Sequence, residues 1–327
     1  MSFRVADLFA GGGGLSLGFM NAGFEIVCAV ENWQPAITIH EANFPSHPVL
    51  NLDLGDATAA AMRIQEFSPD IIVGGPPCQD FSSAGKRDEN LGRASLTISY
   101  AKIVAQCRPQ YFLMENVSRA ANSDAFRKAL DIFKAAGYGL TIKILDAAYC
   151  GAPQLRKRVI VLGGLEERDG FLDAALEGGL SKEPMTIRRY FRDKLPFDHY
   201  YRHPRSYARR AVFSIDEPSP TIRGVNRPIP KGYPGHEGDS ASLDSSLRSL
   251  TTAERARIQT FPSQFKLPGC KTDVEQVIGN AVPVKLAQYV AQHLIGYMQT
   301  SPNAKPLASQ LFQERAKYAV TARRKAA

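Results

Sequence analysis

The sequence predicts an α/β protein: a mostly parallel, doubly wound sheet with a second, smaller and loop-rich domain. Two observations predict the sheet. Short apolar runs alternate with segments of helical periodicity through residues 1–164, and the connections have the length of βαβ units. A third observation, the loss of this pattern after Gly164, predicts the smaller domain. We expect residues 1–178 and 274–327 to form the larger domain and residues 179–273 the smaller one.

Seven apolar runs of four to six residues are the expected strands, because most are bounded by polar or turn-forming residues. They cover Arg4–Phe9, Ile26–Val30, Val49–Leu52, Asp70–Val73, Tyr111–Met114, Leu140–Leu145 and Val159–Leu162. Helical periodicity predicts the helices between and after them, at Leu15–Ala22, Trp33–Ala42, Ala57–Phe67, Leu96–Cys107, Ala125–Ala136, Ala253–Gln259 and Val284–Met298.

Composition excludes several classes of protein. A hydrophobic content of 44% with 22% charged residues is typical of a globular chain and not of a disordered one. No run of 18 apolar residues and no signal-peptide pattern is present, so we expect neither a membrane-spanning nor a secreted protein. The five cysteines are widely spaced without a C-x-x-C pair, which argues against disulfides and structural zinc and favours the cytoplasm.

Positive charge is concentrated in two regions. The 40 Lys and Arg residues exceed the 32 Asp and Glu residues by eight, and residues 248–327 alone carry 12 basic against 4 acidic residues. Residues 186–231 carry 11 basic against 4 acidic residues. Two basic regions on a neutral body favour a polyanionic partner, although solvated surface charge is the alternative.

Two strand ends carry residues suited to a nucleoside. The first strand runs into Phe9-Ala-Gly-Gly-Gly-Gly and then a helix, so that backbone amides can approach a ligand. Ser16 and Leu17 occupy the last-glycine positions of the G-x-G-x-x-G pattern, which favours a nucleoside cofactor other than a dinucleotide. Glu31 ends the second strand, 20 residues after Gly11, where a carboxylate can bind ribose hydroxyls. A surface position at a helix entry is the alternative for Glu31.

The third strand ends near Asp53 and Asp56. Either carboxylate could accept a hydrogen bond from an adenine amino group. Asp56 directly precedes an alanine-rich helix, which favours an N-cap role at that position.

The fourth and fifth strands end in candidate catalytic groups. Gly-Gly-Pro-Pro leads into Cys78, and although a lone cysteine is usually a small core residue, this one lies in a polar loop at the ligand-binding edge of the sheet. We therefore expect a nucleophile. Glu115 ends the fifth strand and lies beside Cys78 if the two strands are neighbours. Arg156 and Arg158, two positions apart, precede the last apolar strand; a solvated edge-strand face is the alternative for them.

In this order the motifs resemble those of the DNA (cytosine-5) methyltransferases of the compact bacterial restriction–modification type. The matching stretches are Asp7-Leu-Phe-Ala-Gly-Gly-Gly-Gly, Pro76-Pro-Cys-Gln-Asp-Phe-Ser, Glu115-Asn-Val, Gln154-Leu-Arg-Lys-Arg, Arg248-Ser-Leu-Thr-Thr-Ala-Glu-Arg-Ala-Arg-Ile-Gln-Thr-Phe-Pro and Gly279-Asn-Ala-Val-Pro. The unmatched segment 165–247 corresponds to the family's variable target-recognition region. The resemblance implies a Rossmann-like, class I methyltransferase sheet, with the smaller domain reading the target.

The resemblance implies S-adenosylmethionine as the cofactor, S-adenosylhomocysteine as the product, and no metal. Glu31 would bind the ribose and Asp53 the adenine. The residues expected around the cofactor are Phe9, Gly11, Gly13, Glu31, Asn32, Asp53, Pro77, Asn280 and Val282. Asn32 stands where some relatives have an aromatic residue, so adenine stacking would come from another residue.

The resemblance also implies covalent catalysis on a cytosine flipped out of the duplex. The Cys78 thiolate would add to C6, which makes C5 nucleophilic towards a methyl group. Glu115 would hydrogen-bond the N3 and amino edge of the base. Arg156 and Arg158 would supply positive charge, and Arg158 would also contact the base carbonyl.

The implied partner is double-stranded DNA. Thr221-Ile222 resembles the Thr-Leu/Val dipeptide of the family's recognition region. The residues expected to contact DNA are Gln79, Ser82, Gln154, Thr221, Arg223 and Arg227. A restriction endonuclease would be paired functionally, without direct contact. We expect a monomer in the bacterial cytoplasm, associated with the nucleoid through DNA and without membrane contact.

Three alternatives differ in class. An RNA (tRNA) cytosine-5 methyltransferase has the same motifs, and the arginine-rich segment 186–231 favours duplex DNA over it. A nicotinamide-dependent oxidoreductase with a catalytic cysteine is opposed by the missing last glycine. A non-catalytic DNA-binding protein of the same fold is opposed by the presence of Cys78, Glu115, Arg156 and Arg158.

Overall fold

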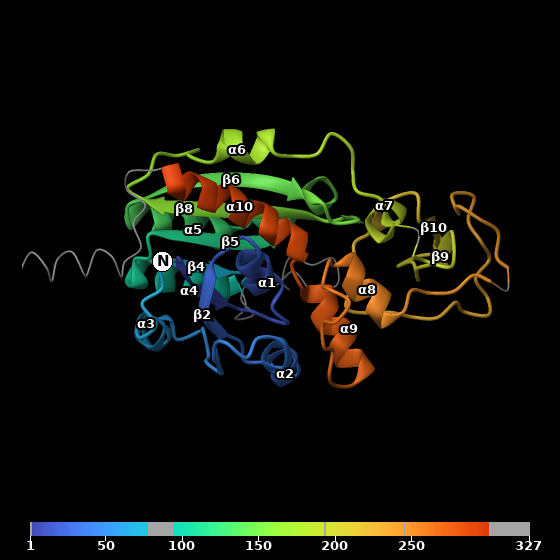
Figure 1. The fold of residues 1–327 in the computed structure, drawn as a ribbon, viewed down its shortest axis with the longest axis horizontal. Helices are drawn as coiled ribbons and strands as arrows, with labels where there is room; N and C mark the ends of the chain where they lie inside the picture. Colours follow the sequence, from blue (N-terminus) through green and yellow to red (C-terminus); the bar gives the residue numbers. More distant parts are fainter. Residues whose placement is uncertain (1, 78–93, 193, 245, 301–327) are drawn as a thin grey trace, which may run out of the picture.

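The computed structural model describes residues 2–77, 94–192, 194–244 and 246–300, built around a seven-stranded sheet (Figure 1). The order of the strands is β3-β2-β1-β4-β5-β8-β6. Their bounds are β1 (Arg4–Leu8), β2 (Glu25–Val30), β3 (Val49–Leu50), β4 (Ile71–Gly74), β5 (Tyr111–Val117), β6 (Tyr138–Asp146) and β8 (Lys157–Leu165). The first five strands of the chain pair in parallel, and β8 runs antiparallel to both β5 and β6. The mostly parallel sheet is confirmed.

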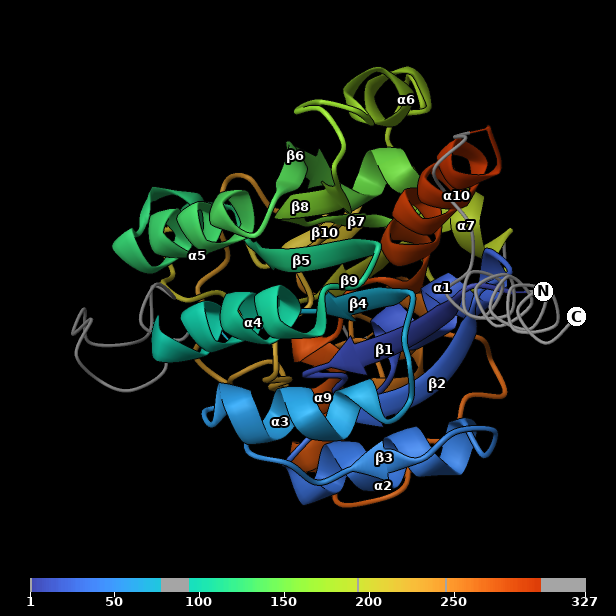
Figure 2. The same cartoon turned by 90° about the vertical axis from the view of Figure 1, so that its left-hand side faces the viewer.

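Helices cover both faces of the sheet, as Figure 2 shows in end view. One face packs against α1 (Gly14–Asn21), α6 (Asp173–Gly178) and α10 (Val284–Thr300). The other face packs against α3 (Ala57–Gln65), α4 (Ala94–Cys107) and α5 (Asp124–Ala135). The chain therefore returns to the large sheet at its last described helix. Close contact with α10 needs Gly18 in α1, because a Cβ there would collide with Ala287.

Polar caps fix where several helices begin. Asp56 accepts a hydrogen bond from the backbone N–H of Ala59 at 3.1 Å, so its expected N-cap role is confirmed. Ser123 caps α5 in the same way. Thr251 and Glu254 form a capping box at the start of α8 (Thr252–Ile258). These caps satisfy N–H groups that have no partner within the helix.

The segment after the sheet forms a smaller part of the molecule, at the right in Figure 1. It contains α7 (Ile187–Phe191), β9 (His199–Tyr201), β10 (Val212–Ser214), β11 (Ser219–Pro220), α8 and α9 (Lys271–Asn280). A third apolar cluster joins this part to α2 (Gln34–Asn43). The two-residue strand β7 (Gln154–Leu155) pairs in parallel with β11, which ties the sheet's last hairpin to the smaller part.

Two 3-10 turns complete the described elements, η2 (Ser118–Asn122) after β5 and η3 (Ala147–Cys150) after β6. Among the described helices, none is long and apolar enough to cross a membrane.

Candidate active site and nucleic-acid interface

The loop that follows β4 starts against the end of β5, because these two strands are parallel neighbours. A Cβ on Gly75 would lie 3.1 Å from Oε2 of Glu115, so a glycine there lets the loop pass close to the carboxylate. The amide of Asn116 donates to the carbonyl oxygen of Pro76 at 3.2 Å. The structure describes this loop as far as Pro77, so Cys78, Gln79 and Ser82 lie outside the described residues.

Glu115 and Arg158 form an ion pair, with 2.6 Å between Oε1 and Nε. Val117 lies opposite Arg158 in the antiparallel β5–β8 register, and Glu115, two positions earlier, shares a face with Val117. The two charged side chains are therefore diagonal neighbours on one face. Their exposed fractions are only 10% and 12%.

Arg156 has a different environment from Arg158. Its side chain is buried, and its guanidinium donates to the carbonyl oxygens of Ile222 and Gly279, each at 3.1 Å. Burial, with the nearby charge of Arg158, lowers the pKa of Arg156. The solvated edge-strand alternative is wrong for this residue. Arg156 instead joins Ile222 in the smaller part to the last turn of α9.

Gln154 is also buried, with no exposed surface. Its Oε1 accepts from the backbone N–H of Ile222 at 2.7 Å, and its Nε2 donates to Gln259 at 2.8 Å. The expectation that this side chain contacts DNA needs correction, because both ends of its amide bind the protein. Thr221, next to Ile222, donates from its hydroxyl to the carbonyl oxygen of Leu155 at 2.7 Å.

Two residues expected to bind the cofactor, Gly11 and Glu31, lie just after the ends of β1 and β2 and are hydrogen-bonded to each other. Oε2 of Glu31 accepts from the backbone N–H of Gly11 at 2.9 Å, and Oε1 accepts from those of Asn32 and Trp33 at 2.9 Å. A carboxylate has about four acceptor sites, so capacity for a ligand hydroxyl is left. Gly11 has φ +54°, and a Cβ on it would meet no described atom within 4 Å. Within the part of the chain that the structure describes, the space over this turn is therefore open.

The chain that follows α9 approaches the same turn. A Cβ on Gly14 would collide with the carbonyl oxygen of Val282, so this glycine is needed for the contact. Asn280 is exposed and its Oδ1 accepts from Gln276. Phe9 has φ 58°, and Gly13, which caps α1, has φ 89°.

Asp53 lies farther along the sheet edge. Its side chain is exposed, and Oδ1 accepts from the backbone N–H of Gly55 at 2.8 Å. Its other carboxylate oxygen therefore has room for a ligand donor.

A basic groove of about 540 Å³ lies between the sheet and the smaller part. Its lining includes eight basic residues and, among the described residues that line it, no acidic one. The basic residues are Arg119, Lys157, Arg158, Arg202, Arg205, Arg209, Arg210 and Arg223. Thr221 lines it as well, and Arg158 joins it to the Glu115 ion pair. A groove of one sign of charge attracts a polyanion.

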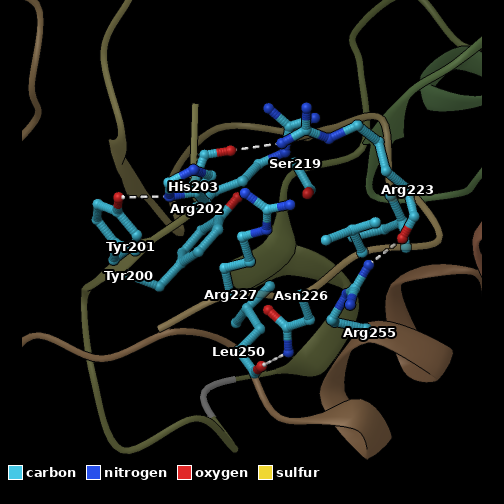
Figure 3. Close-up of a pocket in the computed structure, with 12 residues that line it drawn as sticks. Tyr200, Tyr201, Arg202, His203, Ser219, Arg223, Asn226, Arg227, Leu250 and Arg255 are labelled. Carbon is cyan, nitrogen blue, oxygen red and sulfur yellow. Dashed lines mark hydrogen bonds between the residues drawn. The ribbon is translucent and has the colours of Figure 1, made fainter. Parts of the chain in front are cut away.

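A cavity of about 20 Å³, enough for one water molecule, lies beside the groove (Figure 3). Figure 3 shows Arg202, Arg223 and Arg227 among the side chains that line this cavity. Burial and the neighbouring arginines lower the pKa of Arg202 to about 10. The guanidinium of Arg223 donates to the carbonyl oxygen of His203, while Arg227 is exposed. Arg255 is the one arginine of this cavity that the described residues show in an ion pair, with Glu275.

Several residues that line the groove are not among the site residues expected from the sequence. Arg119 follows β5, and Lys157 lies between the two expected arginines, where its exposed side chain lines the groove. Arg205 and Arg209 come from the basic segment 186–231, whose charge density pointed to the region but not to the residues. Nothing in the sequence indicates which of these side chains share one groove.

The fold is Rossmann-like, and at the edge where ligands bind in such sheets it carries a carboxylate–arginine pair beside a basic groove. The family model for C-5 cytosine-specific DNA methylases matches residues 3–296, and the chain belongs to this family. It is thus a DNA (cytosine-5-)-methyltransferase.

Two curated relatives are similar over nearly their whole length. The Type II methyltransferase M.HindV of Haemophilus influenzae is 55% identical over 295 residues, which cover 90% of this chain and 97% of that protein. The Type II methyltransferase M.HgiDI of Herpetosiphon aurantiacus is 54% identical, over 90% of this chain and 95% of its own. These similarities place the chain among methyltransferases of the Type II restriction–modification kind.

Solved structures show the same fold. A prophage-encoded DNA modification methyltransferase of E. coli has a TM-score of 0.67 and 22% identity, covering 91% of this chain and 100% of its own. The Dnmt2 methyltransferase of S. pombe has a TM-score of 0.66 and 20% identity, covering 90% and 99%.

Proposed function

We propose that this enzyme transfers a methyl group from S-adenosylmethionine to C5 of one cytosine within a specific double-stranded DNA sequence. The observation that carries the proposal is the position of the Glu115–Arg158 ion pair. The pair lies beside the start of the Cys78 loop, and Arg158 also lines the basic groove. A base extruded from DNA in that groove would meet a carboxylate and a guanidinium, and Cys78, the proposed source of the thiol, follows Pro77 directly in the sequence.

The residues present fit S-adenosylmethionine. Open space lies over Gly11, Glu31 keeps an acceptor site for a ribose hydroxyl, and Asp53 offers a carboxylate oxygen to an adenine amino group. Phe9, Gly13, Asn32, Pro77, Asn280 and Val282 complete the proposed pocket. When bound, the cofactor supplies an electrophilic methyl group on its sulfonium and leaves as S-adenosylhomocysteine. No metal is assigned a role.

Cys78 is the proposed nucleophile. Its thiolate forms a bond to C6 of the cytosine, the electron pair of the C5–C6 double bond moves to C4–C5, and that of C4–N3 moves to N3. The product is an enamine whose C5 can attack a methyl carbon. After methylation a base, proposed to act through water, removes the C5 proton. The electron pair then restores the C5–C6 bond and expels the Cys78 thiolate.

Glu115 and Arg158 are proposed to hold the base during this addition. The carboxylate of Glu115 accepts a hydrogen bond from the amino group of cytosine, and also from N3, which takes up a proton as the thiolate adds and releases it when the C5–C6 bond is restored. Arg158 contacts the base carbonyl and keeps Glu115 in place through their ion pair. A target cytosine must leave the duplex to reach both, which costs a few kcal/mol.

Arg156 is proposed to act through its position and charge, without touching the base. Its guanidinium donates to the backbone carbonyls of Ile222 in the smaller part and of Gly279 in α9. Gln154 supports the same arrangement by holding the N–H of Ile222. The network keeps Thr221 and Arg223 in place beside the groove.

The basic groove is the proposed DNA site, with the smaller part supplying most of its arginines. Phosphate contacts by Lys and Arg give sequence-independent affinity, whereas base edges give specificity. Thr221, Arg223 and Arg227 are the proposed candidates for reading bases, together with Gln79 and Ser82 of the Cys78 loop. The same proposal makes the enzyme a monomer. A restriction endonuclease would be paired with it functionally, without direct contact.

The proposal is tested by methyl transfer from radiolabelled S-adenosylmethionine to unmethylated duplex DNA, with the product nucleoside identified. The expected product is 5-methylcytosine at one sequence. Label in tRNA but not in several genomes of diverse sequence would contradict a DNA substrate and support the RNA alternative.

A further inference from the structure

Two buried histidines lie behind the glycine turn. His40, in α2, has no exposed surface, and His47, after α2, is 7% exposed. Their Nε2 atoms are 2.9 Å apart. The other ring nitrogen of His40, Nδ1, is 3.3 Å from the carbonyl oxygen of Gly11. His40 therefore connects the glycine turn to His47.

The Gly11 carbonyl determines where the protons lie. A carbonyl oxygen only accepts, so Nδ1 of a neutral His40 carries the proton and its Nε2 accepts. His47 must then donate from its own Nε2. Burial lowers the pKa of His40 to about 4 and lowers that of His47 as well. Both rings are therefore neutral at pH 7, as this chain of hydrogen bonds requires.

The two peptide groups that flank Gly11 are thus each held by a side chain. Its N–H donates to Glu31 at 2.9 Å and its carbonyl accepts from His40. The ring of Phe44 lies 4.6 Å from that of His40 and occupies the space where a Cβ on Gly13 would be. Aromatic side chains therefore pack behind the turn, while no described atom lies within 4 Å of a Cβ placed on Gly11.

We propose that His40, oriented by His47, is a positioning residue that holds the Gly11 turn ready for the cofactor. Glycine has more backbone freedom than any other residue, so an unsupported turn would lose more entropy when a ligand binds. The hydrogen bonds from Glu31 and His40 remove that freedom in advance. This inference rests on the proposed use of S-adenosylmethionine.

The test is calorimetric binding of S-adenosylhomocysteine to the full chain without DNA. His40→Phe fills the ring's space without either hydrogen bond, and His40→Asn keeps a donor near the position of Nδ1. We expect His40→Phe to raise Kd about tenfold, the effect of one lost hydrogen bond, and His40→Asn to stay within about threefold of wild type. The fluorescence of Trp33, the sole tryptophan, is a second readout because the backbone N–H of this residue donates to Glu31.

Kinetic constants distinguish a positioning role of His40 from a general loss of the protein's structure. We expect His40→Phe to raise KM for S-adenosylmethionine while kcat at saturation and the Kd for DNA change less than about twofold, since the hydrogen bond acts on the turn. His293→Phe is the matched control, because His293 also contacts a backbone carbonyl, that of Tyr289, but in α10. His47→Gln and His47→Phe form a second pair if His40→Phe does not fold.

Two results would overturn the inference alone: cofactor affinity unchanged in His40→Phe and His47→Phe, or an equal loss in the Phe and Asn variants of His40. A wild-type protein that binds no S-adenosylhomocysteine would instead overturn the proposed cofactor, and the inference with it.

Discussion

Glu115 and Arg158 lie on neighbouring antiparallel strands and pair through Oε1 and Nε at 2.6 Å. Both are nearly buried, so neither charge is well screened by water. The reversed direction of β8 brings its first residues to the edge where β5 ends. An acceptor for the base edge and a donor for its carbonyl are thereby placed side by side.

The first prediction concerns this pair. Glu115→Gln keeps the side chain's size but removes its charge, so we expect the single-turnover rate of methyl transfer to fall about 10²–10³-fold, as for the loss of one preorganised transition-state contact. DNA affinity should change little. Rapid-quench kinetics with labelled cofactor measure this, and Glu41→Gln, an exposed change on α2, is the control. A loss below tenfold would argue against a role at the reacting base.

A second prediction is that Arg156, unlike the adjacent Lys157, contributes strongly to the stability of the fold. Arg156→Met leaves the carbonyl oxygens of Ile222 and Gly279 without their donor inside the protein. We expect the free energy of unfolding to fall by about 2–4 kcal/mol, the cost of unsatisfied buried acceptors. Urea denaturation measures it, with Lys157→Met, an exposed change at the next position, as the control. Equal stability of the two variants would contradict the proposed network.

A third prediction addresses the groove. Arg209→Ala and Lys157→Ala each remove an exposed positive charge from its lining. If each contacts one phosphate, the slope of log K against log salt concentration should decrease by about one per variant, equally for target and non-target duplexes. Lys128→Ala on α5, outside the groove lining, should leave the slope unchanged. Unchanged slopes in both groove variants would place the DNA elsewhere.

A fourth prediction uses pH. Asp7 is fully buried, its Oδ2 accepts from the Ser16 hydroxyl at 2.6 Å, and burial raises its pKa from 3.8 to about 7. Between these values the folded protein holds a proton that the unfolded chain releases, so this group's contribution to stability falls as pH rises from about 4 to about 7.

Asp7→Asn removes this dependence. The unfolding free energy of the variant relative to wild type should increase by about 1.4 kcal/mol per pH unit across that window, and level off above it. Urea unfolding between pH 4.5 and 8 provides the measurement. A difference that does not vary with pH would mean that Asp7 titrates as an ordinary aspartate.

The sequence predicted the sheet because its signals are local. Apolar runs between polar or turn-forming residues gave seven strands, and the position of Glu115 beside the Cys78 loop followed from the parallel pairing of β4 and β5. The reversal of β8 had no such signal. Strands β9 to β11 are only two or three residues long, too short for a period of two to be visible.

At the site, the direction in which each side chain points was harder to predict from the sequence than the positions of the strands. Gln154 belongs to a motif rich in charge, and its burial depends on the pairing of β7 with β11, more than sixty residues away along the chain. Arg156 and Arg158 belong to the same motif, two positions apart, yet Arg156 is buried inside the protein and Arg158 lines the groove. Such differences arise from long-range packing that no single segment specifies.

Covalent catalysis by Cys78 is tested by one comparison between the wild type and a variant without the thiol. Wild type and Cys78→Ala are each given labelled S-adenosylmethionine and duplex DNA containing the target, with binding of S-adenosylhomocysteine as the control for folding. We predict label in 5-methylcytosine for wild type and none for the variant, while both bind the product cofactor. Methylation by Cys78→Ala at a comparable rate would contradict the account.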